Sequence, residues 1–366
     1  MLSKKQDIWA VNQLLFFFMS FGILMVIAKW ASELVVPLLI STMIALLLQP
    51  VMKRLEALGL PRSLALALVI LIMILLLTLF GIFIVTEIND FVAHTASFKE
   101  KLKVLLDQLF QFIHGLGLPQ REQEMERIFQ PEGMVALFKK TLVQLGNQFS
   151  NTLLILFSAS FLIMDSLDFR SKLHRILRDD PERLAAIEEV LGKMHTYFSI
   201  MAKVSLITGI SALLLLWFFK VDYALLWATL TFFLNFIPVV GSIIAAVPPV
   251  ILALVEHSWS TGLWVALGYL LINNVVGNIL QPTMMGRGLG LSSFTVFWSM
   301  IFWGWFFGPT GMILSVPLTM GVQFLLLQYD ETRWLGFLLG DYSEKDAREE
   351  ETEAPTQSPS PSERPS

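Results

Sequence analysis

The feature that most constrains the fold is an uncharged run of 22 residues, Leu64–Val85. A helix needs about 20 apolar residues to cross the hydrocarbon core of a bilayer. Only 15% of the 366 residues are charged, against about a quarter in soluble domains. The sequence therefore predicts an all-α polytopic membrane protein. Further apolar blocks lie at residues 14–28, 34–48, 149–164, 200–219 and 263–280.

Two longer apolar stretches, 223–255 and 294–327, are each interrupted by proline and glycine. Pro238 and Gly241 break the first stretch, and Pro309 and Gly311 break the second. A Val-Pro pair follows each break, so the two stretches resemble each other. Together with the unbroken blocks they give about eight membrane segments. They predict two helical hairpins in an inverted repeat, an arrangement typical of secondary transporters. Two kinked hairpins that merely pack tightly would give the same pattern.

Basic residues predict the orientation, because cytoplasmic loops of membrane proteins are enriched in Lys and Arg. They concentrate before the first block, between the second and third blocks, and between residues 170 and 193, whereas the opposite short loops hold only Lys29 and Lys220. We therefore expect a multi-pass protein of the bacterial inner membrane with both termini in the cytoplasm. Residues 86–148 are then extracytoplasmic (periplasmic), and their apolar side chains recur at helical spacing.

The same pattern divides the chain into six parts. Residues 1–85 hold spans one to three, 86–148 the amphipathic extracytoplasmic helices, 149–165 the fourth span and 166–198 a basic cytoplasmic helix. Residues 199–328 form the transport core with both broken hairpins. Residues 329–366 form a cytoplasmic tail that is rich in Glu, Pro and Ser from about residue 344, a composition typical of disorder.

Amide side chains are the candidate solute-binding groups. Asn274, Asn278 and Gln281 follow one another at i, i+4 and i+7, and amides in a membrane face protein or a cavity. Neutral amides both donate and accept hydrogen bonds, which suits a polar, uncharged, hydroxyl-rich solute. Bonding between helices is the alternative role for each of them. The candidate path comprises Asn235, Asn273, Asn274, Asn278, Gln281 and Arg287; Arg287 lies in a glycine-rich loop that we expect to be non-helical, and it would serve equally as a cytoplasmic anchor.

Several classes of protein are disfavoured by what the sequence lacks. There is no Gly-x-x-x-x-Gly-Lys-Ser/Thr motif for phosphate binding and no metal-spaced histidine pair, and the chain has no cysteine. We therefore expect no enzyme activity or catalytic residue, no cofactor, no metal and no nucleic-acid partner. The expected partners are a small polar solute and the lipid bilayer.

The residues around the breaks resemble the autoinducer-2 exporter (AI-2E) family. The resemblance rests on three runs: 268–292, which holds Met285-Gly286-Arg287-Gly288; 235–249, which begins Asn235-Phe-Ile-Pro238; and 301–319, which holds Gly308-Pro309-Thr-Gly311. It spans about residues 8–340. It implies export of the quorum-sensing signal autoinducer-2, or a similar small polar solute, by a homo-oligomer for which a pentamer is one candidate. Gln281 stands where family members tend to carry Glu, which removes a charge from the site.

Two alternatives remain open at this point. Some relatives are proposed to be sodium/proton antiporters, and such a protein would depend on the carboxylates at the span ends, Asp165, Asp222 or Glu256. A non-transporting scaffold or assembly factor would instead place its important residues within 86–148.

Overall fold

The computed structural model of the chain is helical throughout the part that it describes. That part comprises residues 19–93 apart from 21, 24 and 28, residues 100–111 apart from 106, 109 and 110, and residues 152–285 and 290–341. Five helical stretches are long and apolar enough to cross a membrane. The multi-pass helical architecture expected from the hydrophobic blocks is therefore confirmed. The five stretches are Ser32–Ala57, Arg62–Glu87, Pro181–Phe218, Trp259–Met285 and Pro309–Leu327.

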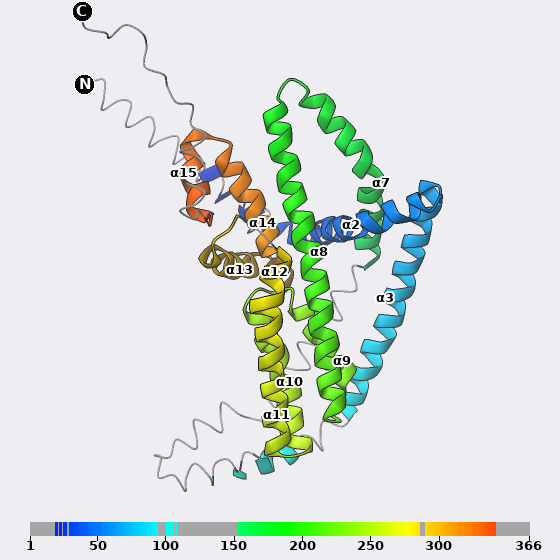
Figure 1. The fold of residues 1–366 in the computed structure, drawn as a ribbon, viewed down its shortest axis with the longest axis vertical. Coiled ribbons are helices and arrows are strands. Elements are labelled where there is room, and N and C mark those ends of the chain that lie inside the picture. Colours follow the sequence, from blue (N-terminus) through cyan, green and yellow to red (C-terminus); the bar gives the residue numbers. More distant parts are fainter. Residues whose placement is uncertain are drawn as a thin grey trace, which may run out of the picture.

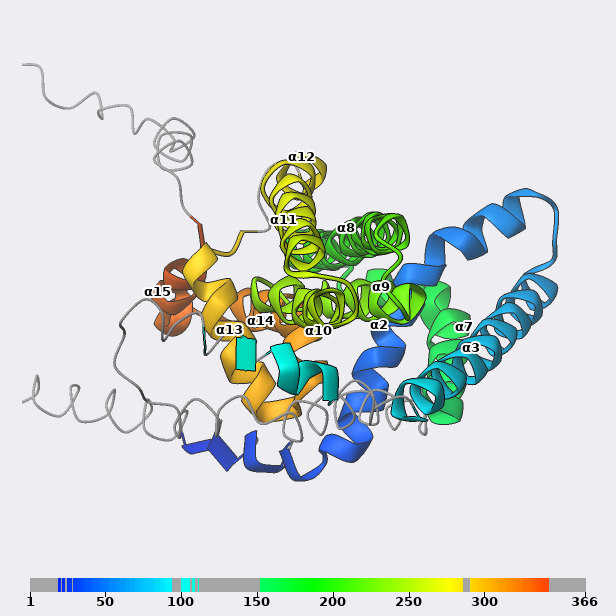
Figure 2. The same cartoon turned by 90° about the horizontal axis from the view of Figure 1, so that it is seen from below.

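Helices α2 (Ser32–Ala57), α3 (Arg62–Ala93) and α7 (Thr152–Ile176) pack together on one side of the molecule (Figure 2). The buried hydroxyl of Ser41 in α2 donates to the carbonyl oxygen of Ile155 in α7 at 2.9 Å. The guanidinium of Arg62 donates to the carbonyl oxygens of Ile163 and Met164. These bonds satisfy polar groups that lipid cannot, so they fix α7 against the α2–α3 pair.

Helix α8 (Pro181–Phe218) is the longest element and runs the height of the molecule (Figure 1). It starts as its sequence predicts: Asp180 caps it by accepting from the backbone N–H of Arg183 at 3.0 Å, and Pro181 occupies the first turn. The helix continues without a break from the polar 181–198 part into the apolar part. One continuous helix therefore joins the polar part to the apolar part.

Helices α9 (Ala224–Leu234), α10 (Val240–Glu256) and α11 (Trp259–Val275) return alongside the lower part of α8 (Figure 1). A π-helical turn (Val276–Leu280) and α12 (Gln281–Met285) extend α11. Buried apolar side chains from α8, α9, α10 and α11 and from the turn after α8 form one cluster, which Leu102 joins from elsewhere in the chain. Its members are Leu102, Ala212, Leu216, Val221, Trp227, Leu230, Leu252, Ala253, Val265 and Tyr269.

Helices α13 (Ser293–Phe307), α14 (Pro309–Leu327) and α15 (Asp330–Leu339) form the last group. The side-chain amide of Gln323 in α14 donates to the carbonyl oxygens of Gly290 and Gly336 at 2.9 and 3.2 Å. The backbone N–H of Ser292 donates to the carbonyl oxygen of Leu339 at 3.1 Å. The start of α13 and the end of α15 are thereby held against α14.

Candidate functional site

The first broken stretch is a tight helical hairpin, formed by α9, the bend at residues 235–239, and α10. Val239 at the bend has φ 62°, which is a strained value for a β-branched residue. Gly241 lies against the end of α9, and a Cβ built on it would overlap the carbonyl oxygen of Leu234. Glycine is therefore required here because main chain touches main chain.

The second broken stretch, formed by α13, Gly308 and α14, repeats this construction. Gly308 has φ 68° and precedes Pro309, which takes the first turn of α14. A Cβ on Gly311 would overlap the carbonyl oxygen of Trp303 in α13. Each hairpin thus places a glycine, two or three residues after its proline, against the backbone of the preceding helix. The two breaks are alike in geometry as well as in sequence.

The bend of the first hairpin and the second hairpin contribute side chains to the same buried cluster. Phe236 is buried in one cluster with Leu314 and Val316 of α14. Tyr197, Phe198 and Met201 of α8 join the same cluster. The two hairpins and α8 therefore meet in one cluster of buried side chains.

Two of the predicted amides lie at the first bend. The side-chain NH₂ of Asn235 donates to the hydroxyl of Ser205 in α8 at 3.0 Å. The side-chain NH₂ of Asn273 in α11 donates to the carbonyl oxygen of Ser242 at 3.5 Å. The Asn273 oxygen is buried and has no hydrogen-bond partner within the described residues. A buried acceptor without a partner there can accept one further hydrogen bond, for example from a hydroxyl group.

The structure separates the remaining amides. Asn274 and Asn278 lie on an exposed face, where the NH₂ of Asn278 donates to the side-chain oxygen of Asn274 at 3.0 Å. The π-helical turn then adds a residue to the repeat and alters the register. Gln281 is consequently turned toward α8, and its NH₂ lies 3.6 Å from the Met201 sulfur.

The loop that carries Arg287 is only partly within the described residues. Residues 286–289 lie outside them, so the predicted place of Arg287 is untested. Pro282–Met285 belong to α12, so the expectation that the loop is non-helical from Pro282 is wrong for these four residues.

Buried hydroxyl and indole groups near the hairpins escaped the sequence analysis. Thr231 of α9 lies with its hydroxyl 3.3 Å from that of Tyr269 in α11. The Trp303 indole of α13 donates to the Thr319 hydroxyl of α14 at 3.0 Å. Both pairs tie helices together across a break. Isolated Thr and Trp residues carry no periodic signal, so only the three-dimensional pairing reveals them.

Carboxylates gather at the lower end of the first hairpin, outside the five spans. The backbone N–H of Asp222 donates to the Glu256 carboxylate at 3.4 Å. Burial, and then the charge of Asp222, raise the pKa of Glu256 to about 7. Within the described residues no group of three His, Cys, Asp or Glu could hold a metal ion.

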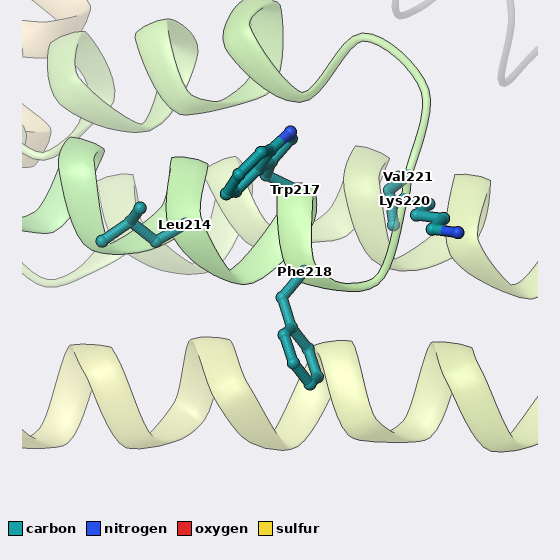
Figure 3. A pocket seen from close by; sticks show the side chains of 5 residues that line it. All are labelled: Leu214, Trp217, Phe218, Lys220 and Val221. Carbon is teal, nitrogen blue, oxygen red and sulfur yellow. The ribbon is translucent and has the colours of Figure 1, made fainter.

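The lower end of α8 also carries an open pocket of about 660 Å³, lined by Leu214, Trp217, Phe218, Lys220 and Val221 (Figure 3). Trp217 and Phe218 are about three-quarters exposed and point to different sides of the helix (Figure 3). None of the predicted amides lines this pocket. Aromatic and basic side chains at a helix end are typical of a membrane–water interface, so the pocket is better explained as lipid-facing surface.

Comparison with known proteins identifies the family of the chain. The family described as "AI-2E family transporter" matches residues 14–331. The AI-2 transport protein TqsA of Escherichia coli K12 is 32% identical over 317 residues, covering 87% of this chain and 92% of that protein. A Haemophilus influenzae protein with only a general transport-protein name is 36% identical over 324 residues, with 86% and 92% covered. E. coli YhhT, also named for transport in general terms, is 30% identical over 289 residues, with 79% and 83% covered. By this family match and these identities, the chain belongs to the AI-2E transporter family.

Proposed function

We propose that the protein is a secondary transporter that moves a small polar solute, autoinducer-2 or a compound like it, out of the cell. The observation that carries the proposal is the pair of glycine-locked hairpins meeting at α8, in a chain of a transporter family. Broken helices near the middle of a membrane are a recurring place for solute sites in secondary transporters. The name of TqsA supports autoinducer-2 as the first solute to test.

The proposed membrane arrangement follows from the same features. The two hairpins count as one segment each, which gives about eight segments in all, and they are related as an inverted repeat. Both termini are cytoplasmic, and the lower end of the molecule in Figure 1 is extracytoplasmic. The basic residues of the upper part of α8 support this orientation.

The solute path is proposed to pass the bend of the first hairpin. Asn235 and Asn273 would contact the solute there, since the buried Asn273 oxygen has no partner within the described residues and can accept a hydrogen bond. Gln281 would continue the path along α8, and Arg287 would stand at its cytoplasmic end. The exposed pair Asn274–Asn278 would belong to the path in a homo-oligomer, such as a pentamer, in which a neighbouring subunit covers that face.

Flux into and out of reconstituted liposomes tests the proposal. Autoinducer-2 and sodium should be compared side by side in the same preparation, with Asn273→Leu as the paired variant. Saturable autoinducer-2 flux that Asn273→Leu weakens would support the assignment. Flux of sodium alone, coupled to protons, would refute it.

The second candidate, a cation/proton antiporter, has one specific observation in its favour. Glu256 has a pKa of about 7 and lies beside Asp222, so it can exchange a proton near physiological pH. A pH-dependent sodium flux that Glu256→Gln abolishes would establish this candidate in place of the first.

A further inference from the structure

We propose that the short helical segment at residues 100–105 is a cap, which covers the extracytoplasmic ends of α8 to α11 and has to lift for solute to leave. The proposal rests on the transport function given above. It adds a role for a segment that lies far from the hairpins in the sequence. Figure 1 shows this segment in cyan at the lower ends of α10 and α11.

Leu102 is the part of the segment that seats in the bundle. Its side chain is only 2% exposed and belongs to the cluster formed by the lower ends of α8, α9, α10 and α11. Trp227, Leu252 and Val265 are members of that cluster, one from each of the last three helices. An apolar side chain in this position excludes water from the ends of these four helices.

The preceding residue places a charge near the same helix ends. Lys101 is exposed, and its positive charge acts on the Glu256 carboxylate at the end of α10. Glu256 in turn accepts from the backbone N–H of Asp222 in the turn before α9. The charged groups that face Glu256 are therefore Asp222 and Lys101, one from each element packed there. Lys101 thus links the segment to both ends of the first hairpin.

The attachment is narrow, which suits an element that opens. Only Leu102 and Leu105 of the segment pack into the cluster. Lys103 and Val104 point away and are exposed, Val104 by 52%. Elements held by few buried apolar side chains open at a lower free energy than the core that they cover. Lifting residues 100–105 would therefore remove these two side chains and leave the other members of the cluster in place.

Cysteine labelling tests whether the cap closes and lifts. The chain has no cysteine, so Leu102→Cys and Lys103→Cys each introduce a single thiol on opposite faces of the segment. In liposomes, an impermeant maleimide should label Leu102→Cys at least tenfold more slowly than Lys103→Cys. Adding autoinducer-2 should speed labelling of Leu102→Cys alone. Equal rates for the two variants, or a Leu102→Cys rate that solute leaves unchanged, would overturn the cap.

Tethering then tests whether lifting is required. A flexible thiol-to-thiol cross-linker should join Lys101→Cys to Glu256→Cys and stop flux, and a reducing agent should restore it. The matched pair Val104→Cys with Glu256→Cys, whose first thiol points outward, should keep its flux under the same treatment. Full flux in the tethered Lys101 pair would refute the gate. No flux from the wild-type protein would instead refute the transport function, and the labelling rates distinguish this result from failure of the cap.

Discussion

Replacing Gly311 by alanine is the sharpest test of how the hairpins are built. The added Cβ would occupy the space of the Trp303 carbonyl oxygen, which belongs to the backbone and cannot rotate away. The two helices of the second hairpin would have to separate. Overpacking of this kind costs about 1–3 kcal/mol. We expect Gly241→Ala to behave in the same way, because it meets the Leu234 carbonyl oxygen.

Gly81→Ala provides the matched control. Gly81 lies within α3, and a Cβ there would meet nothing within 4 Å. Alanine favours a helix interior over glycine by about 0.5–1 kcal/mol, so this variant should unfold at the same temperature as wild type or higher. Thermal unfolding in detergent, followed by tryptophan fluorescence, measures all three. A melting temperature for Gly311→Ala that equals that of Gly81→Ala would refute the main-chain contact.

Three further predictions concern the path, the carboxylates and the orientation. Asn278→Leu should raise the half-saturation concentration of flux by one to two decades if the amide binds solute, a loss of about 1–3 kcal/mol; an unchanged value with a lower melting temperature would mean that it only joins helices. Because the folded pKa of Glu256 is raised from 4.5 to about 7, the folded state favours the protonated form, and this stability is lost as the pH rises through about 7. The melting temperature should therefore fall from pH 5 to pH 8 in wild type and change less in Glu256→Gln. The underlying loss in the free energy of unfolding should be no more than about 2 kcal/mol after solvent screening. Single cysteines at Ser97 and Ser171 should label from opposite faces of intact cells, and equal labelling at both would refute the orientation.

The helices and their breaks could be predicted because lipid imposes simple rules on sequence. The uncharged run at Leu64–Val85 can only be a buried or spanning helix, and it lies within α3. Pro238 and Pro309 mark bends because neither can continue the hydrogen bonding of the preceding helix. Apolar periodicity does not, however, report where a soluble part ends. Helix α8 runs through the expected boundary at residue 198 without interruption, so its apolar spacing could not mark that boundary.

The site was less accessible to sequence reasoning because amide spacing assumes a regular helix. Asn274 and Asn278 do lie together, as a spacing of four predicts. The π-helical turn adds a residue before Gln281, and no sequence pattern announces it. The burial of the Asn273 oxygen likewise depends on how α11 meets the first bend. The seating of Leu102 depends on a contact between segments more than a hundred residues apart.

The glycine contacts also determine which parts of the molecule can move. Where two backbones touch directly, the two helices of a hairpin cannot slide or separate without breaking the contact. Each hairpin is therefore expected to move as a rigid body. The contact around Phe236, Leu314 and Val316 is made of side chains, which can exchange rotamers and re-pack. Any cycle between inward and outward access would therefore require this side-chain cluster to re-pack. Mutations that prevent this re-packing would leave both hairpins intact and still stop the cycle.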